Sequence, residues 1–192
     1  MTAIIGLISK TKGRVTIWLG ADSALTDDNG GIVTSKDEKV FTLNNGTVGL
    51  AYAGSCRVGQ LLRYSLKVPN IPEKRLPRWM STVFVNTMKE CLREGGLLQK
   101  KAGADCMGDA TSAVVGLRGR LFVINEDFHV MEARKPFTAS GSGADLALGS
   151  LFTTHKQKGK PRDKVLAALR AAEAFSSSVR RPFRVIKIVT NK

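Results

Sequence analysis

The order in which strand-like and helix-like patterns follow one another constrains the fold of this 192-residue chain most. Strand patterns come first, two helical patterns follow, strands return, and two further helical patterns precede a last strand. A helix with apolar residues at i, i+3 and i+4 buries one face, and a half-buried strand buries one side of its sheet. Paired helices between groups of antiparallel-looking strands therefore predict an α+β protein with two packed sheets and a helix layer outside each.

The first half of the sequence contains five predicted strands and two predicted helices. Apolar runs separated by turn signals predict strands over residues 3–9, 14–20, 32–35, 39–43 and 48–52. Apolar stripes predict one helix from about Ser55 to Lys67 and another from about Pro77 to Gly95. Cys91 falls on the second stripe, so we expect it in the core rather than in an active site.

The second half of the sequence contains four predicted strands and two predicted helices. We expect a loop over residues 100–110 and a turn of small residues over 137–143. Helices are predicted over 144–154 and from Pro161 onward, with a basic loop over 156–160 between them. The remaining apolar runs predict strands over 112–117, 120–125, 129–133 and 183–189. Since no linker or repeat divides the sequence, we expect a single domain over residues 1–192.

The charge of the chain is strongly basic. Thirty Lys and Arg residues against sixteen Asp and Glu residues give a net charge of +14 and a pI near 10.1. Such a surface attracts nucleic acid or acidic proteins. The basic residues are scattered, however, and two Trp and two Tyr are too few to form the stacking platforms of a single-strand binder. We do not expect nucleic acid as the main partner.

The cysteines and the hydropathy pattern indicate the compartment. The three cysteines have no CxxC spacing, so neither a disulfide framework nor a zinc site is expected. No apolar run reaches the 18 or so residues of a membrane span, and the pattern of a signal peptide is absent. The expectation is a cytoplasmic protein without membrane contact and without a metal or other cofactor.

Five short segments carry a resemblance that runs over nearly the whole chain. They are Gly20-Ala21-Asp22-Ser23-Ala24-Leu25-Thr26, Glu38-Lys39-Val40-Phe41, Ala53-Gly54-Ser55, the stretch from Ser140 to Gly149, and Ala172-Glu173-Ala174-Phe175-Ser176. In this order they resemble the signature of proteasome β-type subunits and of their HslV-like relatives in bacteria and phages. The resemblance implies a four-layer αββα sandwich of the N-terminal nucleophile (Ntn) hydrolases, which cleave peptide bonds. It also implies a homo-oligomeric ring, peptide or protein substrates, and an ATPase unfoldase as a further partner.

The resemblance also implies roles for individual residues. Thr2 becomes the nucleophile once Met1 is removed, Asp22 and Lys39 match the charged pair of the family, and Gly54 matches its oxyanion donor. The supporting groups are the hydroxyls of Ser142 and Ser176, with Glu173 in place of the usual aspartate. The residues implied in substrate binding are Thr26, Phe41, Tyr52 and Cys56.

The implied chemistry is physically consistent. A threonine hydroxyl needs a base to take its proton, and a free α-amine with a pKa of about 7.7–8.0 is such a base. A nearby Lys39 cation would lower the pKa of that amine, and Asp22 would compensate the buried cation. The backbone N–H of Gly54 would stabilise the oxyanion. Glu173 shares a helix face with Leu166 and Leu169, so its carboxylate needs a partner.

Simpler interpretations stand beside these. Asp22 and Gly54 are also ordinary turn residues, Lys39 an ordinary lysine at a strand edge, and Ser142 a helix N-cap. Ser177-Ser178 occupies the place where the family usually has a Gly-Gly pair. A non-catalytic scaffold or assembly subunit of the same fold, and an Ntn amidase acting on small molecules, are the alternative functions.

Overall fold

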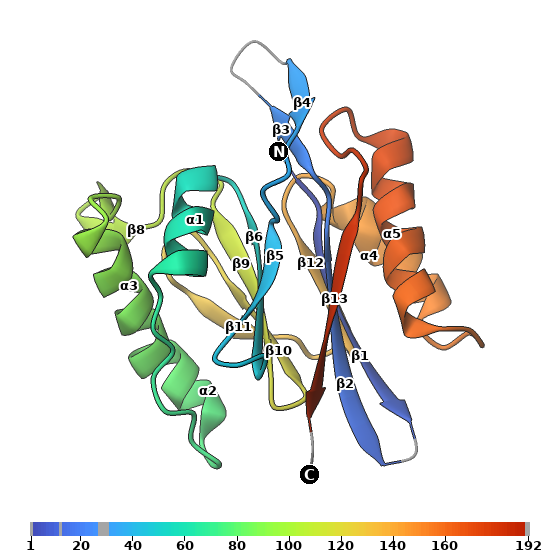
Figure 1. The fold of residues 1–192 in the computed structure, drawn as a ribbon, viewed down its shortest axis with the longest axis horizontal. Helices are drawn as coiled ribbons and strands as arrows, with labels where there is room; N and C mark the ends of the chain where they lie inside the picture. Colours follow the sequence, from blue (N-terminus) through green and yellow to red (C-terminus); the bar gives the residue numbers. More distant parts are fainter. Residues whose placement is uncertain (1, 12, 27–30, 191–192) are drawn as a thin grey trace.

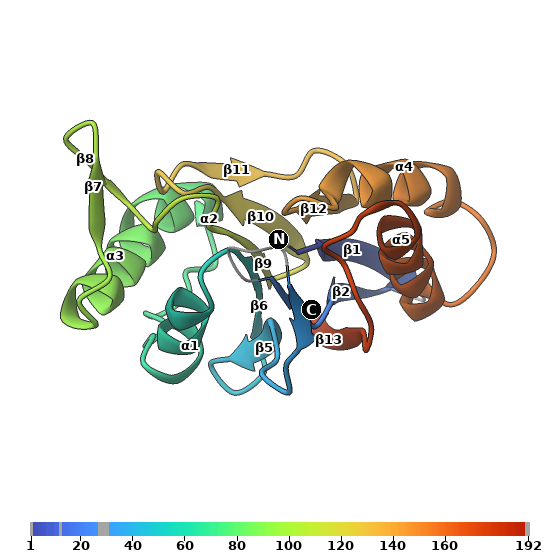
Figure 2. The same cartoon turned by 90° about the horizontal axis from the view of Figure 1, so that it is seen from above.

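Two β-sheets pack face to face between two layers of helices in the computed structural model, which describes residues 2–11, 13–26 and 31–190 (Figure 1). Figure 2 shows the same four layers from above. The predicted αββα sandwich is therefore confirmed. Met1 and the sequence signal of a turn, Asp27-Asp28-Asn29-Gly30, lie outside the described residues.

The first sheet has four strands in the order β12-β1-β2-β13, all antiparallel. Its strands are β1 (Ile4–Thr11), β2 (Arg14–Ala21), β12 (Phe137–Ser140) and β13 (Arg184–Thr190). Ile4 lies opposite both Ala21 and Ser140, so the beginning of β1 meets the ends of β2 and β12. The prediction of a turn over 137–143 was wrong for 137–140, because pairing with β1 gives this segment the hydrogen bonds of a strand.

The second sheet has five strands in the order β11-β10-β9-β6-β5. They are β5 (Val40–Leu43), β6 (Val48–Ala53), β9 (Ser112–Leu117), β10 (Arg120–Ile124) and β11 (Val130–Glu132). Every residue of β6 and of β9 is buried, as expected of central strands covered on both faces. These runs agree with the predicted strands to within two residues.

Helices cover the outer face of each sheet (Figure 1). The second sheet is covered by α1 (Cys56–Tyr64), α2 (Leu76–Trp79), the π-helical turn η1 (Met80–Phe84) and α3 (Val85–Glu94). The first sheet is covered by α4 (Ala144–Thr154) and α5 (Pro161–Phe175). Helix α1 begins after its N-cap Ser55, as predicted, but ends at Tyr64, three residues before the predicted Lys67.

Two small hairpins extend from the layers. One pairs β3 (Ala24–Thr26) with β4 (Ile32–Thr34), and the other pairs β7 (Gln99–Lys101) with β8 (Ala104–Cys106). The second hairpin corrects the expectation of a loop over 100–110. Gly103 supplies the positive φ of its turn, and Lys100 pairs with Asp105 across it at 2.7 Å.

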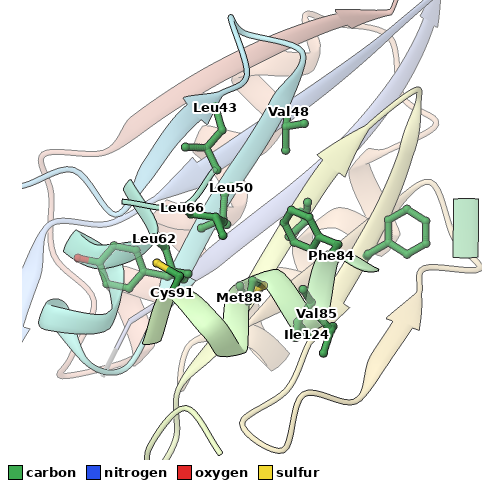
Figure 3. Close-up of a cluster of buried hydrophobic side chains, with 14 of the residues drawn as sticks. Leu43, Val48, Leu50, Leu62, Leu66, Phe84, Val85, Met88, Cys91 and Ile124 are labelled. Carbon is green, nitrogen blue, oxygen red and sulfur yellow. The ribbon is translucent and has the colours of Figure 1, made fainter. Parts of the chain in front are cut away.

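The apolar core lies in three layers. One layer fills the space between α1–α3 and the second sheet, where Leu62, Met88 and Cys91 of the helices meet Leu50 and other strand residues (Figure 3). A second layer lies between the two sheets, and a third between the first sheet and α4–α5. Cys91 is 7% exposed, which confirms its predicted place in the core.

Candidate active site

Thr2 is fixed at the point where the ends of β2 and β12 meet the start of β1. Its side chain and backbone are 2% exposed. Its carbonyl accepts a hydrogen bond from the N–H of Gly143 at 3.2 Å, and its nitrogen donates to Ser142 Oγ at 3.2 Å. A Cβ on Gly141 would lie 2.3 Å from the Thr2 carbonyl oxygen, so only glycine allows this close approach. Thr2 is thus held by the turn between β12 and α4.

The carboxylate of Asp22, directly after β2, is saturated with hydrogen bonds. Its side chain is completely buried. It accepts backbone N–H groups from Ala3 at 3.2 Å, Ala24 at 3.0 Å and Arg180 at 3.3 Å, and the Lys39 ammonium at 3.3 Å. Two carboxylate oxygens with four donors form a well-compensated buried anion. Asp22 therefore joins four separate segments at the start of β1.

Lys39 lies just before β5 and directs its ammonium at Thr2. The residue is 4% exposed. Its Nζ donates to Thr2 Oγ1, to Asp22 Oδ1 and to the carbonyl of Ala24, which uses all three ammonium hydrogens. Burial lowers the pKa of Lys39 below its ordinary value, and the Asp22 carboxylate opposes that shift. The arrangement places a compensated cation against the hydroxyl of Thr2.

Three serine hydroxyls form a chain on the other side of the Thr2 nitrogen. Ser142 Oγ lies 3.1 Å from Ser178 Oγ, which lies 2.9 Å from Ser176 Oγ. The first residue of α4 follows Gly143, which is the N-cap, so Ser142 does not cap this helix. Ser178 was not predicted as a site residue. It lies in the turn directly after α5, where no periodic pattern in the sequence indicates which side chain faces the site.

Glu173 lies in the last turn of α5 and makes no hydrogen bond with the three serines among the described residues. Within the described part of the protein, its carboxylate accepts hydrogen bonds from Arg181 alone, from the backbone N–H at 2.9 Å and from Nη2 at 2.6 Å. The Arg181 guanidinium holds the pKa of Glu173 below its usual value. The expected need for a partner is met, but by an arginine and not by the serine hydroxyls.

A cavity of about 420 Å³ opens beside Thr2. Gly54 is exposed at its edge with φ of +97°, and a Cβ there would lie 2.6 Å from the Thr111 Cα. Ser112 and Ser140 place their hydroxyls 2.8 Å apart in its wall. The other lining residues are Ala53, Ala110, Thr111, Asn125, Glu126, Gly141 and Ser142. Ala53, Ser140 and Gly141 lie in the segments that carry the family resemblance, but no role was predicted for them. The lining residues from 110–112 and 125–126 were not indicated by the sequence, because they come from distant strands and turns.

The residues implied in substrate binding are placed differently. Phe41 and Tyr52 are buried in the core under α1, with ring centroids 6.5 Å apart, and the Tyr52 ring leaves no room for a side chain at Gly59. Cys56 is the first residue of α1 and is partly exposed. Thr26 ends β3, and its side chain lies outside the described part. Their binding of substrate stays a prediction.

The described residues add two further observations. No helix among them is long and apolar enough to cross a membrane. No group of three or more His, Cys, Asp or Glu side chains among residues 2–11, 13–26 and 31–190 is arranged to hold a metal ion.

Comparison with known proteins defines the fold. No protein-family model and no curated protein sequence matches the chain. The structure is similar to that of BPH from Thiobacillus denitrificans in complex with epoxomicin, with a TM-score of 0.79, 20% identity and full coverage of both chains. It is also similar to the eukaryotic HslV of Trypanosoma brucei, with a TM-score of 0.68, 18% identity and coverage of 97% of this chain and 98% of HslV.

A third similar structure is a mutant of Anbu from Hyphomicrobium sp. strain MC1, with a TM-score of 0.68, 16% identity and coverage of 99% of this chain and 83% of Anbu. The chain therefore has the proteasome-like fold of the Ntn hydrolases over its full length. This agrees with the resemblance found in the sequence.

Proposed function

We propose that this protein is a threonine peptidase whose nucleophile is Thr2 after removal of Met1. The observation that carries this proposal is the Lys39 ammonium, hydrogen-bonded to Thr2 Oγ1 and paired with Asp22 in a buried site. Burying a lysine is unfavourable, and doing so around a threonine hydroxyl is a feature of functional sites more than of structural ones. A cavity large enough for part of a peptide opens beside the same hydroxyl.

The proposed reaction uses the groups already described. Thr2 Oγ attacks the carbonyl carbon of the scissile bond while its proton passes to the Thr2 α-amine, and the Gly54 N–H stabilises the oxyanion. The peptide C–N bond then breaks, the leaving nitrogen takes the proton from the α-amine, and an ester on Thr2 remains. Water, deprotonated by the same amine, hydrolyses this ester and restores the hydroxyl. The Lys39 cation stabilises negative charge on Oγ throughout.

The assembly and location of the protein are part of the proposal. We place it in the cytoplasm as a subunit of a homo-oligomeric ring that encloses the sites and receives protein substrates from an ATPase unfoldase. Phe152 and Phe175 support a subunit contact, since they are 66% and 81% exposed on the α4–α5 layer. Thr26, Phe41, Tyr52 and Cys56 are the proposed substrate-binding residues.

The test starts from protein that begins with Thr2, verified by intact mass. We expect hydrolysis of fluorogenic peptides, its loss by at least about a thousandfold in Thr2→Ala, and partial retention in Thr2→Ser, which keeps the hydroxyl. Epoxomicin, present in the BPH structure, is the probe: we expect it to inhibit the hydrolysis. Hydrolysis that persists in Thr2→Ala, or activity only in protein that keeps Met1, would contradict the proposal.

A non-catalytic scaffold of the same fold is the second candidate. The placement of Glu173 favours it, because this residue takes the position of the family's aspartate but pairs with Arg181. If protein that begins with Thr2 assembles into rings in solution, as measured by native mass, but hydrolyses no peptide, the result would support the scaffold. Hydrolysis of small amides but not of peptides would instead indicate an Ntn amidase.

A further inference from the structure

Thr111 is a buried residue that lies against Gly54, the proposed oxyanion donor. Ala53, the last residue of β6, pairs with Ser112, the first residue of β9. Gly54 and Thr111 therefore continue the two strands side by side, and a Cβ on Gly54 would lie 2.6 Å from the Thr111 Cα. Thr111 is 2% exposed and lines the same cavity as Gly54 and Thr2. A polar side chain is thus buried directly beside this turn.

The hydroxyl of Thr111 has one fixed direction. Its Oγ1 accepts the backbone N–H of Ser55 at 3.3 Å, and its hydrogen is directed at the carbonyl of Asp109 at 3.5 Å. A backbone N–H can only donate and a carbonyl can only accept, so neither bond can reverse. The hydroxyl of Thr111 therefore holds the peptide group that follows Gly54.

The turn at Gly54 needs this support because glycine has more backbone freedom than any other residue. Its φ of +97° lies outside the strand conformation of β6. Ser55 is fixed on the far side as the N-cap of α1. A rotation of the peptide group after Gly54 must therefore be compensated by the peptide group before it, which carries the Gly54 N–H. Holding the Ser55 N–H in place thus also holds the direction of the Gly54 N–H.

The segment that carries Thr111 is itself anchored. Glu126, in the turn between β10 and β11, accepts the N–H of Ala110 at 2.8 Å and the ammonium of Lys101 at 3.0 Å. The backbone carbonyl of Glu126 accepts the N–H of Met107 at 2.8 Å. Because the residues before Thr111 are tied to a neighbouring turn, its hydroxyl has a defined position.

We propose that Thr111 is a positioning residue whose hydroxyl holds the peptide group after Gly54 and so keeps the Gly54 N–H directed at the oxyanion. The role in hydrolysis rests on the proposed function. The effect of the hydroxyl on the turn does not require hydrolysis, so the two can be tested separately.

The test compares Thr111→Val, Thr111→Ser and Thr138→Val in protein that begins with Thr2. Valine keeps the shape of threonine without the hydroxyl, and serine keeps the hydroxyl. Thr138 on β12 is also buried, at 8% exposed, and serves as the matched control. Thr111→Ala likewise lacks the hydroxyl and takes the place of Thr111→Val if the valine variant does not fold.

Peptide hydrolysis and inhibitor affinity report on the oxyanion. A tripeptide aldehyde with apolar side chains adds the Thr2 Oγ–H across its C=O bond, and the oxygen of the resulting hemiacetal lies where the oxyanion forms. The tripeptide alcohol with the same side chains lacks this carbonyl. In Thr111→Val we expect kcat and the affinity for the aldehyde to fall together by about tenfold to a hundredfold, with little change in KM or in the affinity for the alcohol. Thr111→Ser and Thr138→Val should resemble the wild type.

Hydrogen exchange of the Ser55 amide reports on the turn without any hydrolysis. This amide loses its acceptor in Thr111→Val, so it should exchange about fivefold faster than in the wild type, the effect of one hydrogen bond of ordinary strength. In Thr111→Ser and Thr138→Val the exchange rate should equal that of the wild type.

The outcomes separate the two proposals. If the wild type hydrolyses peptides and Thr111→Val keeps its kcat and aldehyde affinity, the positioning role is overturned and the peptidase stands. A loss that affects the alcohol as much as the aldehyde, or that Thr111→Ser does not restore, overturns the positioning role as well. If the wild type hydrolyses nothing, the peptidase is overturned. Faster exchange of the Ser55 amide in Thr111→Val then supports the effect of Thr111 on the turn, and unchanged exchange overturns it.

Discussion

Lys39 Nζ donates a hydrogen bond to Thr2 Oγ1 although the two residues are 37 positions apart in the chain. Two strand ends make the contact. The pairing of Ile4 with Ala21 brings the start of β1 to the end of β2, and Lys39 enters β5 of the facing sheet at the same end of the sandwich. The site is therefore built at the strand ends of the two facing sheets, and regular elements position side chains more precisely than loops do.

Lys39→Met should remove the cation while keeping an apolar chain of similar length. We expect kcat/KM for peptides to fall about 100- to 1,000-fold, because a preorganised group at a developing negative charge contributes about this much. Lys36→Met is the matched control, since this neighbouring lysine is exposed, and it should leave kcat/KM unchanged. A Lys39→Met variant with wild-type kcat/KM would show that the cation has no part in the reaction.

Asp22→Ala should lower stability more than Lys39→Met does. Without the carboxylate, a buried ammonium and three backbone N–H groups lose their acceptor, a loss that typically costs about 3–5 kcal/mol. In Lys39→Met the carboxylate keeps its three backbone donors, so we expect a loss of about 1–3 kcal/mol. Urea unfolding of both variants measures the difference. Equal losses would mean that the backbone donors to Asp22 contribute little.

Local patterns were sufficient to predict most of the fold. Helix α4 was predicted at its observed bounds, because its start after Gly143 and its apolar residues are signals within one segment. Strand β12 was not, since its small and polar residues become a strand only by pairing with β1, about 130 residues away. The β7–β8 hairpin was also missed, because its exposed lysines have no apolar alternation.

The candidate site was predictable to the extent that a resemblance could place it. Asp22 and Lys39 were named from their motifs and Thr2 from the role that the resemblance implies, and the structure brings the three residues into contact. Ser178 and the orientation of Glu173 depend on how the chain turns after α5, and no periodic pattern encodes that turn. Arg181 attracts the Glu173 carboxylate toward its own backbone and side chain, which is a tertiary interaction.

Gly54→Ala should disturb both stability and activity. The alanine would have to adopt a φ near +97° and place its Cβ 2.6 Å from the Thr111 Cα. We expect a loss of about 2–4 kcal/mol, of which about 1–2 comes from the left-handed backbone and the rest from the overlap. If the turn relaxes to avoid that overlap, the Gly54 N–H moves, and kcat should fall while the KM for peptides changes less.

Gly46→Ala is the matched control for this substitution. Gly46 has a similar φ of +81°, but nothing lies within 4 Å of its added Cβ. It should lose only the backbone contribution of about 1–2 kcal/mol and keep full activity. Both losses are measured by thermal and urea unfolding. Equal losses in the two variants would mean that the overlap between the Cβ added in Gly54→Ala and the Thr111 Cα contributes nothing to the loss of stability.

Glu173→Gln tests the ion pair with Arg181 through its pH dependence. The hydrogen bonds from Arg181 lower the pKa of Glu173 in the folded protein, so the folded state binds this proton less readily than the unfolded state does. The stabilisation is therefore fully present above the unfolded pKa of about 4.3 and is lost as the pH falls through the lower folded pKa. Arg181 is 72% exposed, so solvent screening keeps this stabilisation small.

The glutamine variant should thus be less stable than the wild type at pH 7, and the difference in urea midpoint should shrink as the pH falls through the lowered folded pKa of Glu173. Its amide still accepts from the Arg181 backbone N–H, so the chain after α5 should keep its course and the serine chain its geometry. We accordingly expect the acid limb of the pH profile of kcat/KM to lie at the same pH as in the wild type. A shifted limb in Glu173→Gln would mean that this carboxylate acts on the Thr2 amine after all, in the manner of the aspartate that it replaces.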